Sequence, residues 1–330
     1  MKLLTKAHTS QRRLIEILRV IDEGEKPIGA RSISDLLSSR GYELGERAVR
    51  YNLKILDELG FTKREGYNGR ILTPLGIKEL EDALVGDRIG FVNTRIEEYI
   101  YKTTFDPEGM RGDVVANISL LDKKDYEKAA EIIGNVFDAG YNISRRILLI
   151  EEAEGIASME IPKGCLGIAT ICSITLDGLL LRSGIPVNTS FAGVVEIKEH
   201  APAEFTELIA YTGSSLDPMK VFIARKMTRI TDAVGIGTGR VLANVREVPI
   251  AAADLAKSLL KRSKMAGIDG LIGISEMGQP NLGCPAEQGK ISIALYAGIN
   301  GPVAAEESGI RVKNIPISML LDYGKMSDIS

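Results

Sequence analysis

Residues 45–73 read GERAVRYNLKILDELGFTKREGYNGRILT, and this stretch decides the expected fold of the first part of the chain. Apolar residues recur at helical spacing up to Leu59, so the first half is predicted to form a helix that ends at Gly60. The second half holds two short strand-like runs on either side of Asn68-Gly69, a dipeptide typical of hairpin turns. A helix followed by a hairpin is the second half of a winged helix-turn-helix.

The residues before this stretch supply the two other helices that the fold requires. Residues 11–23 carry leucine and isoleucine at helical spacing, and Gly24 ends the run. A shorter apolar segment at residues 33–37 is stopped by Gly41. Three short helices with tight glycine-containing connections match the helix-turn-helix layout. We therefore expect residues 1–84 to form a winged helix-turn-helix domain.

The third of these helices separates into two halves when its residues are placed at about 100° each. The apolar half is expected to hold Ala48 together with larger aliphatic residues, and to pack on the first two helices. The opposite half carries Arg47, Arg50, Tyr51 and Lys54. Such a face suits the major groove, where arginine reads guanine edges and lysine neutralises phosphates. Taken alone, it is also typical of an ordinary solvated helix.

The predicted hairpin and the charge distribution favour the same partner. Lys63, Arg64 and Arg70 would place positive charge on the wing, where backbone phosphate or the minor groove can be reached. Arg31 of the second helix joins this predicted DNA-binding set. Residues 1–76 hold 14 basic and 10 acidic residues, a net charge of +4, whereas the rest of the chain carries −7. A basic head on an acidic body favours a polyanion, which we expect to be double-stranded DNA.

Composition narrows the class of protein. The chain has 330 residues, 45% of them hydrophobic and 26% charged, which is the balance of a soluble globular protein with two or three domains. No apolar run approaches the roughly 20 residues that cross a bilayer. Cys165, Cys172 and Cys284 are widely spaced, and only His8 and His200 could supply imidazole. We therefore expect a cytoplasmic protein without a disulfide framework, a metal site or an enzymatic activity.

The remainder of the chain is expected to be a mixed α/β (α+β) effector domain. Short β-branched runs there alternate with helix-like segments and with glycine, proline and asparagine. We place a connector at residues 85–112 and the effector domain at residues 113–330. Its two expected lobes cover about 113–240 and 241–330.

A faint internal repeat suggests these two lobes. Residues 117–187 resemble residues 244–312 at offsets of 123 to 127, and Gly178 is placed opposite Gly301. Two similar lobes would form a natural cleft for a small ligand. Coincidence among glycine-rich loops is the alternative explanation of the pattern.

Specific stretches of the chain resemble a known family of regulators. Residues 27–37 and 47–61 resemble the winged-helix module of bacterial ribonuclease R and the head of the NrpR family of archaeal nitrogen-regulation repressors. The body resembles the NrpR effector domain at residues 161–173, 184–193 and 235–240. The order of head and body makes the match specific. Some members carry two effector domains, and this chain resembles the shorter form with one.

The resemblance implies a function and a ligand. It implies a transcriptional repressor that binds an inverted-repeat operator of nitrogen-assimilation genes as a dimer or higher oligomer, and that 2-oxoglutarate releases. It implies an effector ligand and no cofactor. The single effector domain leaves open whether a headless paralogous partner chain is needed.

A ligand with two carboxylates and a ketone needs hydrogen-bond donors at both ends. Three polar or glycine-rich segments of the body are expected to supply them, and each is also typical of a structural turn. The expected effector-binding residues are Lys163, Gly164, Cys165, Thr170, Cys172 and Ser173, then Thr189 and Ser190, then Gly237, Thr238 and Arg240.

Other functions stay open at this point. A ligand-responsive regulator of other metabolic genes fits the same residues. An RNA-binding adaptor is suggested by the ribonuclease R resemblance, and an enzyme with an appended winged helix is permitted by the glycine-rich loops. Nucleotide binding at residues 235–240 is disfavoured, because the third glycine of the dinucleotide fingerprint is missing and the loop precedes a strand.

Overall fold

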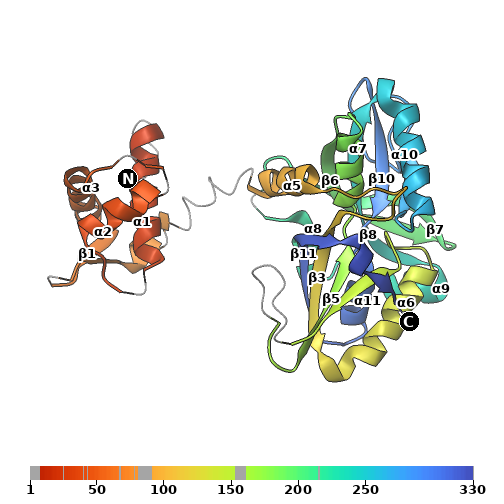
Figure 1. Ribbon diagram of the computed structural model, residues 1–330, viewed down its shortest axis with the longest axis horizontal. Helices are drawn as coiled ribbons and strands as arrows, with labels where there is room; N and C mark the ends of the chain where they lie inside the picture. The colour runs from red at the N-terminus through yellow and green to blue at the C-terminus, as the bar shows by residue number, and fades with distance from the viewer. Residues whose placement is uncertain are drawn as a thin grey trace. The chain divides into compact units, whose positions relative to one another are not determined.

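The computed structural model describes residues 8–24, 26–39, 41–42, 44–66, 68–77, 79–80, 91–152, 161–214 and 216–329. The chain divides into two compact units, Met1–Ile89 and Gly90–Ser330 (Figure 1). Each is described by itself below.

The first unit is a winged helix, which confirms the fold expected for the head. Its elements are α1 (His8–Asp22), α2 (Ala30–Ser39), α3 (Glu46–Glu58), β1 (Thr62–Arg64) and β2 (Arg70–Leu72). The two strands pair antiparallel, with Thr62 opposite Leu72. Ile28 extends this hairpin by bridging to Arg70, and a Cβ at Gly69 would lie 2.3 Å from the Ile28 backbone. The wing is therefore attached to the segment before α2 by a contact that only glycine permits.

The recognition helix α3 is positioned by its apolar face. Val49, Leu53 and Leu56 are fully buried against α1 and α2, at the helical spacing that the sequence predicts. The prediction that Ala48 belongs to the buried apolar half of this helix was wrong, because Ala48 is exposed. It lies at the edge of the apolar face, where a single methyl group contributes little to burial.

The second unit contains two five-stranded antiparallel sheets, and its mixed architecture confirms the expected fold class. The strands run in the orders β7-β6-β8-β10-β9 and β11-β3-β5-β4-β12. The elements are α5 (Phe91–Lys102), β3 (Asp113–Asp122), α6 (Tyr126–Asp138), β4 (Arg146–Ile150), β5 (Cys165–Ile171), α7 (Ile174–Arg182), β6 (Asn188–Lys198), β7 (Ala201–Ala210), α8 (Pro218–Ala224), α9 (Ile230–Ile236), β8 (Gly239–Pro249), α10 (Ala253–Met265), β9 (Leu271–Ile274), β10 (Lys290–Tyr296), α11 (Asn300–Glu307), β11 (Val312–Asp322) and β12 (Ser327–Asp328).

The order of elements in this unit occurs twice, and the two halves exchange a strand. The series β3-α6-β4-β5-α7-β6 recurs as β8-α10-β9-β10-α11-β11. The last strand of each half joins the sheet of the other half: Val194 of β6 lies opposite Leu242 of β8, and Ile315 of β11 lies opposite Ile118 of β3. Separation of the halves would therefore break both sheets.

Hydrogen bonds at the starts of α7 and α11 fix the equivalence of the two halves. Thr175 Oγ1 accepts from the Val115 N–H (3.0 Å) and donates to the Val115 carbonyl (3.3 Å). Asn300 makes the same two contacts with Leu242, at 3.0 and 2.9 Å. The offset at these helices is thus 125 residues, so the sequence pairing of Gly178 with Gly301 is two residues out of register.

Part of the expected connector belongs to the second unit. Helix α5 lies within the residues 85–112 that the sequence analysis assigned to a connector, and it packs against α7. Ile96 and Ile100 are buried, and Tyr99 donates from its hydroxyl to the Ser318 carbonyl at 2.7 Å. The i, i+4 spacing of the two isoleucines in the sequence is typical of a helix with one buried face. In the part of the chain that the structure describes, no helix is long and apolar enough to cross a membrane.

Candidate functional site

The exposed face of α3 is the candidate nucleic-acid surface of the head. Arg47, Arg50, Tyr51 and Lys54 all lie on it, and Tyr51 is 69% exposed. Arg50 is held by Glu46 one turn earlier at 2.5 Å, whereas Arg47 forms no ion pair with any residue that the structure describes. Among the residues that the structure describes, the Arg47 guanidinium is therefore left without an ion pair, on the same face as the exposed Tyr51 ring.

The three basic residues predicted on the wing make different contacts in the structure. Arg70 donates to both carboxylate oxygens of Asp57, and Thr62 donates to the same carboxylate at 2.6 Å. The Arg70 side chain is only 20% exposed, and its contacts with Asp57 join β2 to the end of α3. Lys63 is exposed, while Arg64 donates to the Gly66 carbonyl at 3.1 Å. Asp57, which the sequence analysis passed over, is the residue that fixes the wing on α3. Arg31 is exposed on α2.

A small cavity in the second unit lies where the two halves meet. It is lined by equivalent segments from both halves: Asn117 with Asn244, and residues 172–174 with residues 297–299. Tyr211 also lines it. The cavity measures about 10 Å³, which is the room that one water molecule needs. We call this cavity the cleft. Two predicted effector residues, Cys172 and Ser173, line it.

Three residues that line the cleft have backbone N–H groups without a hydrogen-bond partner among the described residues. Ser173, Gly298 and Ile299 precede α7 and α11, and all three residues are buried. Their N–H groups form no hydrogen bond with any residue that the structure describes. A buried N–H group without a partner is rare in proteins and calls for a water or ligand acceptor. Donors at helix N-termini favour an anion.

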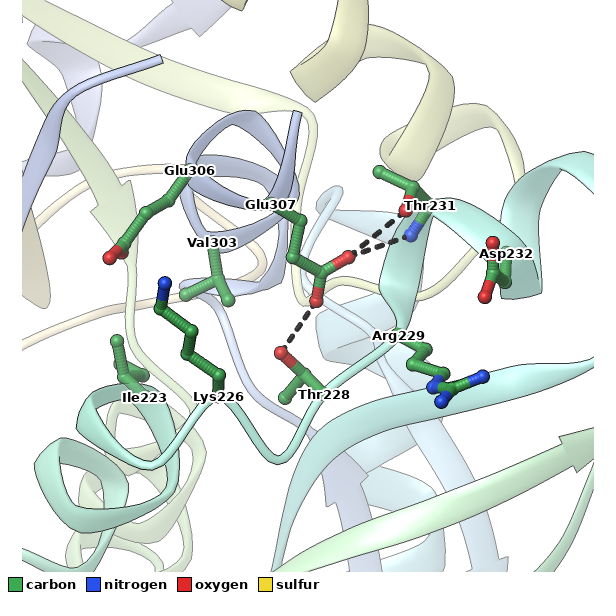
Figure 2. Close-up of a pocket in the computed structure, with 9 residues that line it drawn as sticks. All are labelled: Ile223, Lys226, Thr228, Arg229, Thr231, Asp232, Val303, Glu306 and Glu307. Carbon is green, nitrogen blue, oxygen red and sulfur yellow. Dashed lines mark hydrogen bonds between the residues drawn. The ribbon is translucent and has the colours of Figure 1, made fainter. Parts of the chain in front are cut away.

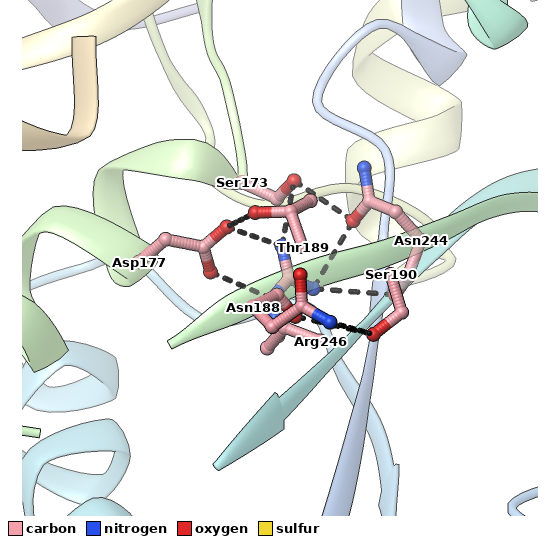
Figure 3. Close-up of polar contacts among 7 residues, drawn as sticks. All are labelled: Ser173, Asp177, Asn188, Thr189, Ser190, Asn244 and Arg246. Carbon is pink, nitrogen blue, oxygen red and sulfur yellow. Dashed lines mark hydrogen bonds and ion pairs between the residues drawn. The ribbon is translucent and has the colours of Figure 1, made fainter. Parts of the chain in front are cut away.

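A buried charged network supports one wall of the cleft (Figure 3). Arg246 of β8 and Asp177 of α7 are both 0% exposed, and Arg246 Nε donates to Asp177 Oδ1 at 2.7 Å. Arg246 also donates to Asn244 Oδ1 (3.1 Å) and to Ser173 Oγ (3.3 Å), while Thr189 Oγ1 donates to Asp177 Oδ2 (2.8 Å). The guanidinium is neutralised and hydrogen-bonded, as a buried cation requires. The network ties α7 to β6 and β8.

Burial raises the pKa of three titratable groups around the cleft. It raises the pKa of the Cys172 thiol to about 12, and it raises the pKa of the Tyr211 hydroxyl well above its usual value. The pKa of Asp217, which caps α8, is also raised by burial. A reactive cysteine needs the opposite shift, because the thiolate is the nucleophile. Among the described residues, no group of three or more histidine, cysteine or acidic side chains is arranged to hold a metal.

The structure brings some predicted effector residues together and separates others. Thr170 lies beside the cleft, where its hydroxyl accepts from the Asn117 amide at 3.4 Å. Thr189 belongs to the buried network, and Ser190 donates to the carbonyl of Asn188, two residues earlier. Lys163, Gly164 and Cys165 lie at the opposite end of β5 from Cys172, about 20 Å away at the usual rise of a strand. They were expected to act with Cys172, and the structure separates them.

The third predicted segment also lies outside the cleft. Gly237 has a left-handed φ of 73° and caps α9, next to the His200 ring. Arg240 bridges through its backbone to Arg229, and Thr238 is exposed. None of the three predicted residues of this segment lines the cleft. Its glycines serve the turn between α9 and β8.

The sequence did contain a signal for the residues that were missed. Asp177 interrupts the mainly apolar run ITLDGLLL in α7, and Arg246 lies with Asn244 and Glu247 among the valines of VLANVREV in β8. A charge in such a run marks either a buried pair or a ligand site. Asn117 and Asn244 recur at an offset of 127, and this recurrence was used only as evidence for the repeat.

Comparison with known proteins agrees with this arrangement of head and body. A family model described as the NrpR regulatory domains NRD1 and 2 matches residues 89–328, and the ribonuclease R winged-helix domain matches residues 15–80. The chain belongs to the NrpR family. The global nitrogen regulator NrpRI of Methanosarcina mazei is 49% identical over 97% of this chain and 98% of that relative.

Two other NrpR relatives are longer. The global nitrogen regulators NrpR of Methanococcus maripaludis and Methanocaldococcus jannaschii are each 32% identical over 94% of this chain, which spans 54% of either relative. The crystal structure of a nitrogen repressor-like protein from Methanococcus jannaschii superposes with a TM-score of 0.61 at 26% identity. That match covers 72% of this chain and 98% of the other. The NrpR resemblance predicted from the sequence is thereby confirmed.

Proposed function

We propose that the chain is a transcriptional repressor of nitrogen-assimilation genes that binds operator DNA through its head and is released by 2-oxoglutarate bound in its body. The observation that carries the proposal is the union of a winged helix, whose α3 presents Arg47 and Tyr51, with an NrpR regulatory domain. The relatives named as global nitrogen regulators share both parts over nearly the whole chain. Those relatives are named as regulators and not as enzymes, which favours a role in binding over catalysis.

The DNA would be an inverted repeat read by two heads. Each α3 enters a major groove, so the two half-sites lie about one helical turn apart or a multiple of that spacing. This geometry requires at least two copies of the chain, in a homodimer or higher oligomer, whether or not a headless paralogous chain also joins the assembly. Phosphate contacts release counterions, and the affinity should therefore fall steeply with salt.

The cleft is the proposed site for 2-oxoglutarate. One carboxylate would accept hydrogen bonds from the N–H groups of Ser173, Gly298 and Ile299, which have no partner among the described residues. A volume of about 10 Å³ holds no keto acid, so the halves must move apart locally to admit it. Since the halves exchange strands, such a movement bends both sheets. We infer that this strain misaligns the heads and lowers the affinity for the operator.

Calorimetric titration of the full chain with 2-oxoglutarate tests the ligand. Glutarate, which has both carboxylates and lacks the ketone, serves as the control and should bind more weakly. Saturable binding of the keto acid supports the assignment. Heat no larger than that of dilution, at every concentration tried, would rule out this effector.

A further inference from the structure

A second pocket lies between α11 and the turn that joins α8 to α9 (Figure 2). Its volume is about 310 Å³, which is within the range of small-molecule sites. It shares no described lining residue with the cleft. Its wall combines side chains of both charges with the aliphatic side chains of Ile223 and Val303.

Lys226 occupies an unusual backbone position at this pocket. It follows the last turn of α8 with a left-handed φ of 51°, and its N–H donates to the Ile223 carbonyl at 3.0 Å. Glycine is the residue that favours this position after a helix. Five other helices, α3, α6, α7, α10 and α11, are followed there by glycine with φ between 77° and 87°: Gly60, Gly140, Gly184, Gly267 and Gly309. The chain therefore places a long cationic side chain where these five helices are followed by glycine.

The pocket presents a cation and a carboxylate that do not neutralise each other. Lys226 and Glu306 extend toward the same space beside Val303 (Figure 2), yet no ion pair forms between them. The Lys226 ammonium forms no ion pair or hydrogen bond with any residue that the structure describes. Glu306 accepts from the Asn314 amide through one oxygen, at 2.8 Å, which leaves the other oxygen available.

The neighbouring carboxylate, by contrast, is fully used in holding the pocket together. Glu307 accepts from the hydroxyls of Thr228 (2.5 Å) and Thr231 (3.2 Å) and from the Ile230 N–H (2.8 Å). These bonds fasten the turn between α8 and α9 to the end of α11. The wall of the pocket is thus formed in advance of any ligand, which lowers the cost of binding.

We propose that this pocket binds a free α-amino acid as its zwitterion. The carboxylate pairs with Lys226, the ammonium pairs with Glu306, and the side chain rests on Ile223 and Val303. Only a ligand with both charges satisfies both groups, because an isolated anion would leave Glu306 facing it and an isolated cation would face Lys226. The inference does not depend on the proposed operator or keto acid.

The pocket and the cleft lie at opposite ends of one helix. Val303, Glu306 and Glu307 of α11 line the pocket, and Ile299, directly before α11, lines the cleft. An amino acid in the pocket would therefore contact the same rigid element as a ligand in the cleft. Any coupling between the two must be reciprocal.

Calorimetric titration of the full chain tests the proposal, with L-valine and L-glutamine as the amino acids. Isovalerate and isobutylamine are valine without its ammonium or without its carboxylate. We expect both amino acids to bind and each analogue to bind at least about tenfold more weakly, since one charge-assisted hydrogen bond is lost. Binding of isovalerate as tight as that of valine, or no binding of either amino acid, would overturn the proposal.

The variant Lys226→Gly separates ligand binding from folding. Glycine favours the left-handed backbone, so the melting temperature should be equal to or above that of the wild type. Affinity for valine should nevertheless fall at least about tenfold. Lys257→Ala, at an exposed lysine of α10, is the control and should bind as the wild type does. Unchanged affinity in Lys226→Gly would refute the assignment of Lys226.

Discussion

The substitution Asp57→Asn tests how the wing is held on the recognition helix. Asp57 accepts from Thr62 of β1 and from Arg70 of β2, so it joins α3 to both strands of the wing. The side chains of Asp57 and Arg70 are only 29% and 20% exposed. Hydrogen bonds to charged groups contribute about 1.5–3 kcal/mol, and we expect the head to lose about 2 kcal/mol of stability. In a domain of this size, that lowers the melting temperature by roughly 8–16 °C.

The effect on DNA affinity distinguishes positioning from simple electrostatics. Asp57→Asn removes a negative charge from the head, and that change alone would strengthen binding to a polyanion. If the carboxylate positions the wing, binding should instead weaken, by about tenfold for a loss of about 1.4 kcal/mol of wing contact. Fluorescence anisotropy with a duplex operator, at a temperature where circular dichroism shows the variant folded, measures this.

A matched control shows whether the change in DNA affinity comes from the position of the wing or from the lost charge. Asp35 is exposed on α2, and its side chain makes no hydrogen bond or ion pair with any residue that the structure describes, so Asp35→Asn changes the charge equally without touching the wing. It should bind DNA as tightly as the wild type or slightly more tightly. If Asp57→Asn behaves like Asp35→Asn in both melting and DNA affinity, the reasoning is refuted.

Three further substitutions or treatments follow from the same contacts. Arg47→Ala should weaken operator binding by about 1–3 kcal/mol and Arg50→Ala by less, because Glu46 already holds Arg50; equal losses in the anisotropy titration would contradict this. Asp177→Asn leaves Arg246 buried without its counter-charge and should cost about 3–5 kcal/mol in urea unfolding, whereas a loss below about 1 kcal/mol would show that the pair is not buried as described. Cys172 has its pKa raised to about 12, so its thiol stays protonated from pH 7 to 10 and should resist iodoacetamide across that range unless the chain is unfolded; rapid modification of native protein at pH 8 would count against the raised pKa.

The head could be predicted from the sequence because its determinants are local. The buried face of α3 and the turn at Asn68-Gly69 each depend on residues a few positions apart. Helical and strand periods read such neighbours directly. The role of Arg70 could not be read this way, since its partner Asp57 lies 13 residues earlier and both look like ordinary surface charges.

For the body, the sequence predicted only the fold class and the repeat. The repeat is visible because equivalent residues recur at nearly constant offsets. The exchange of β6 and β11 leaves no such trace, because a strand's period is the same whichever sheet it joins. The residues of the ligand site could not be predicted for a related reason. Lys163 and Cys172 are close in sequence, yet a strand between them carries them apart, whereas Ser173 and Gly298 are distant in sequence and meet in the cleft.

The most direct test of the account is a titration of an inverted-repeat promoter fragment with the full chain, with and without millimolar 2-oxoglutarate, at several salt concentrations. The account predicts specific, salt-sensitive binding that the keto acid weakens. Binding that ignores 2-oxoglutarate would contradict the effector assignment, and binding no tighter than to random duplex at any salt concentration would contradict the repressor itself.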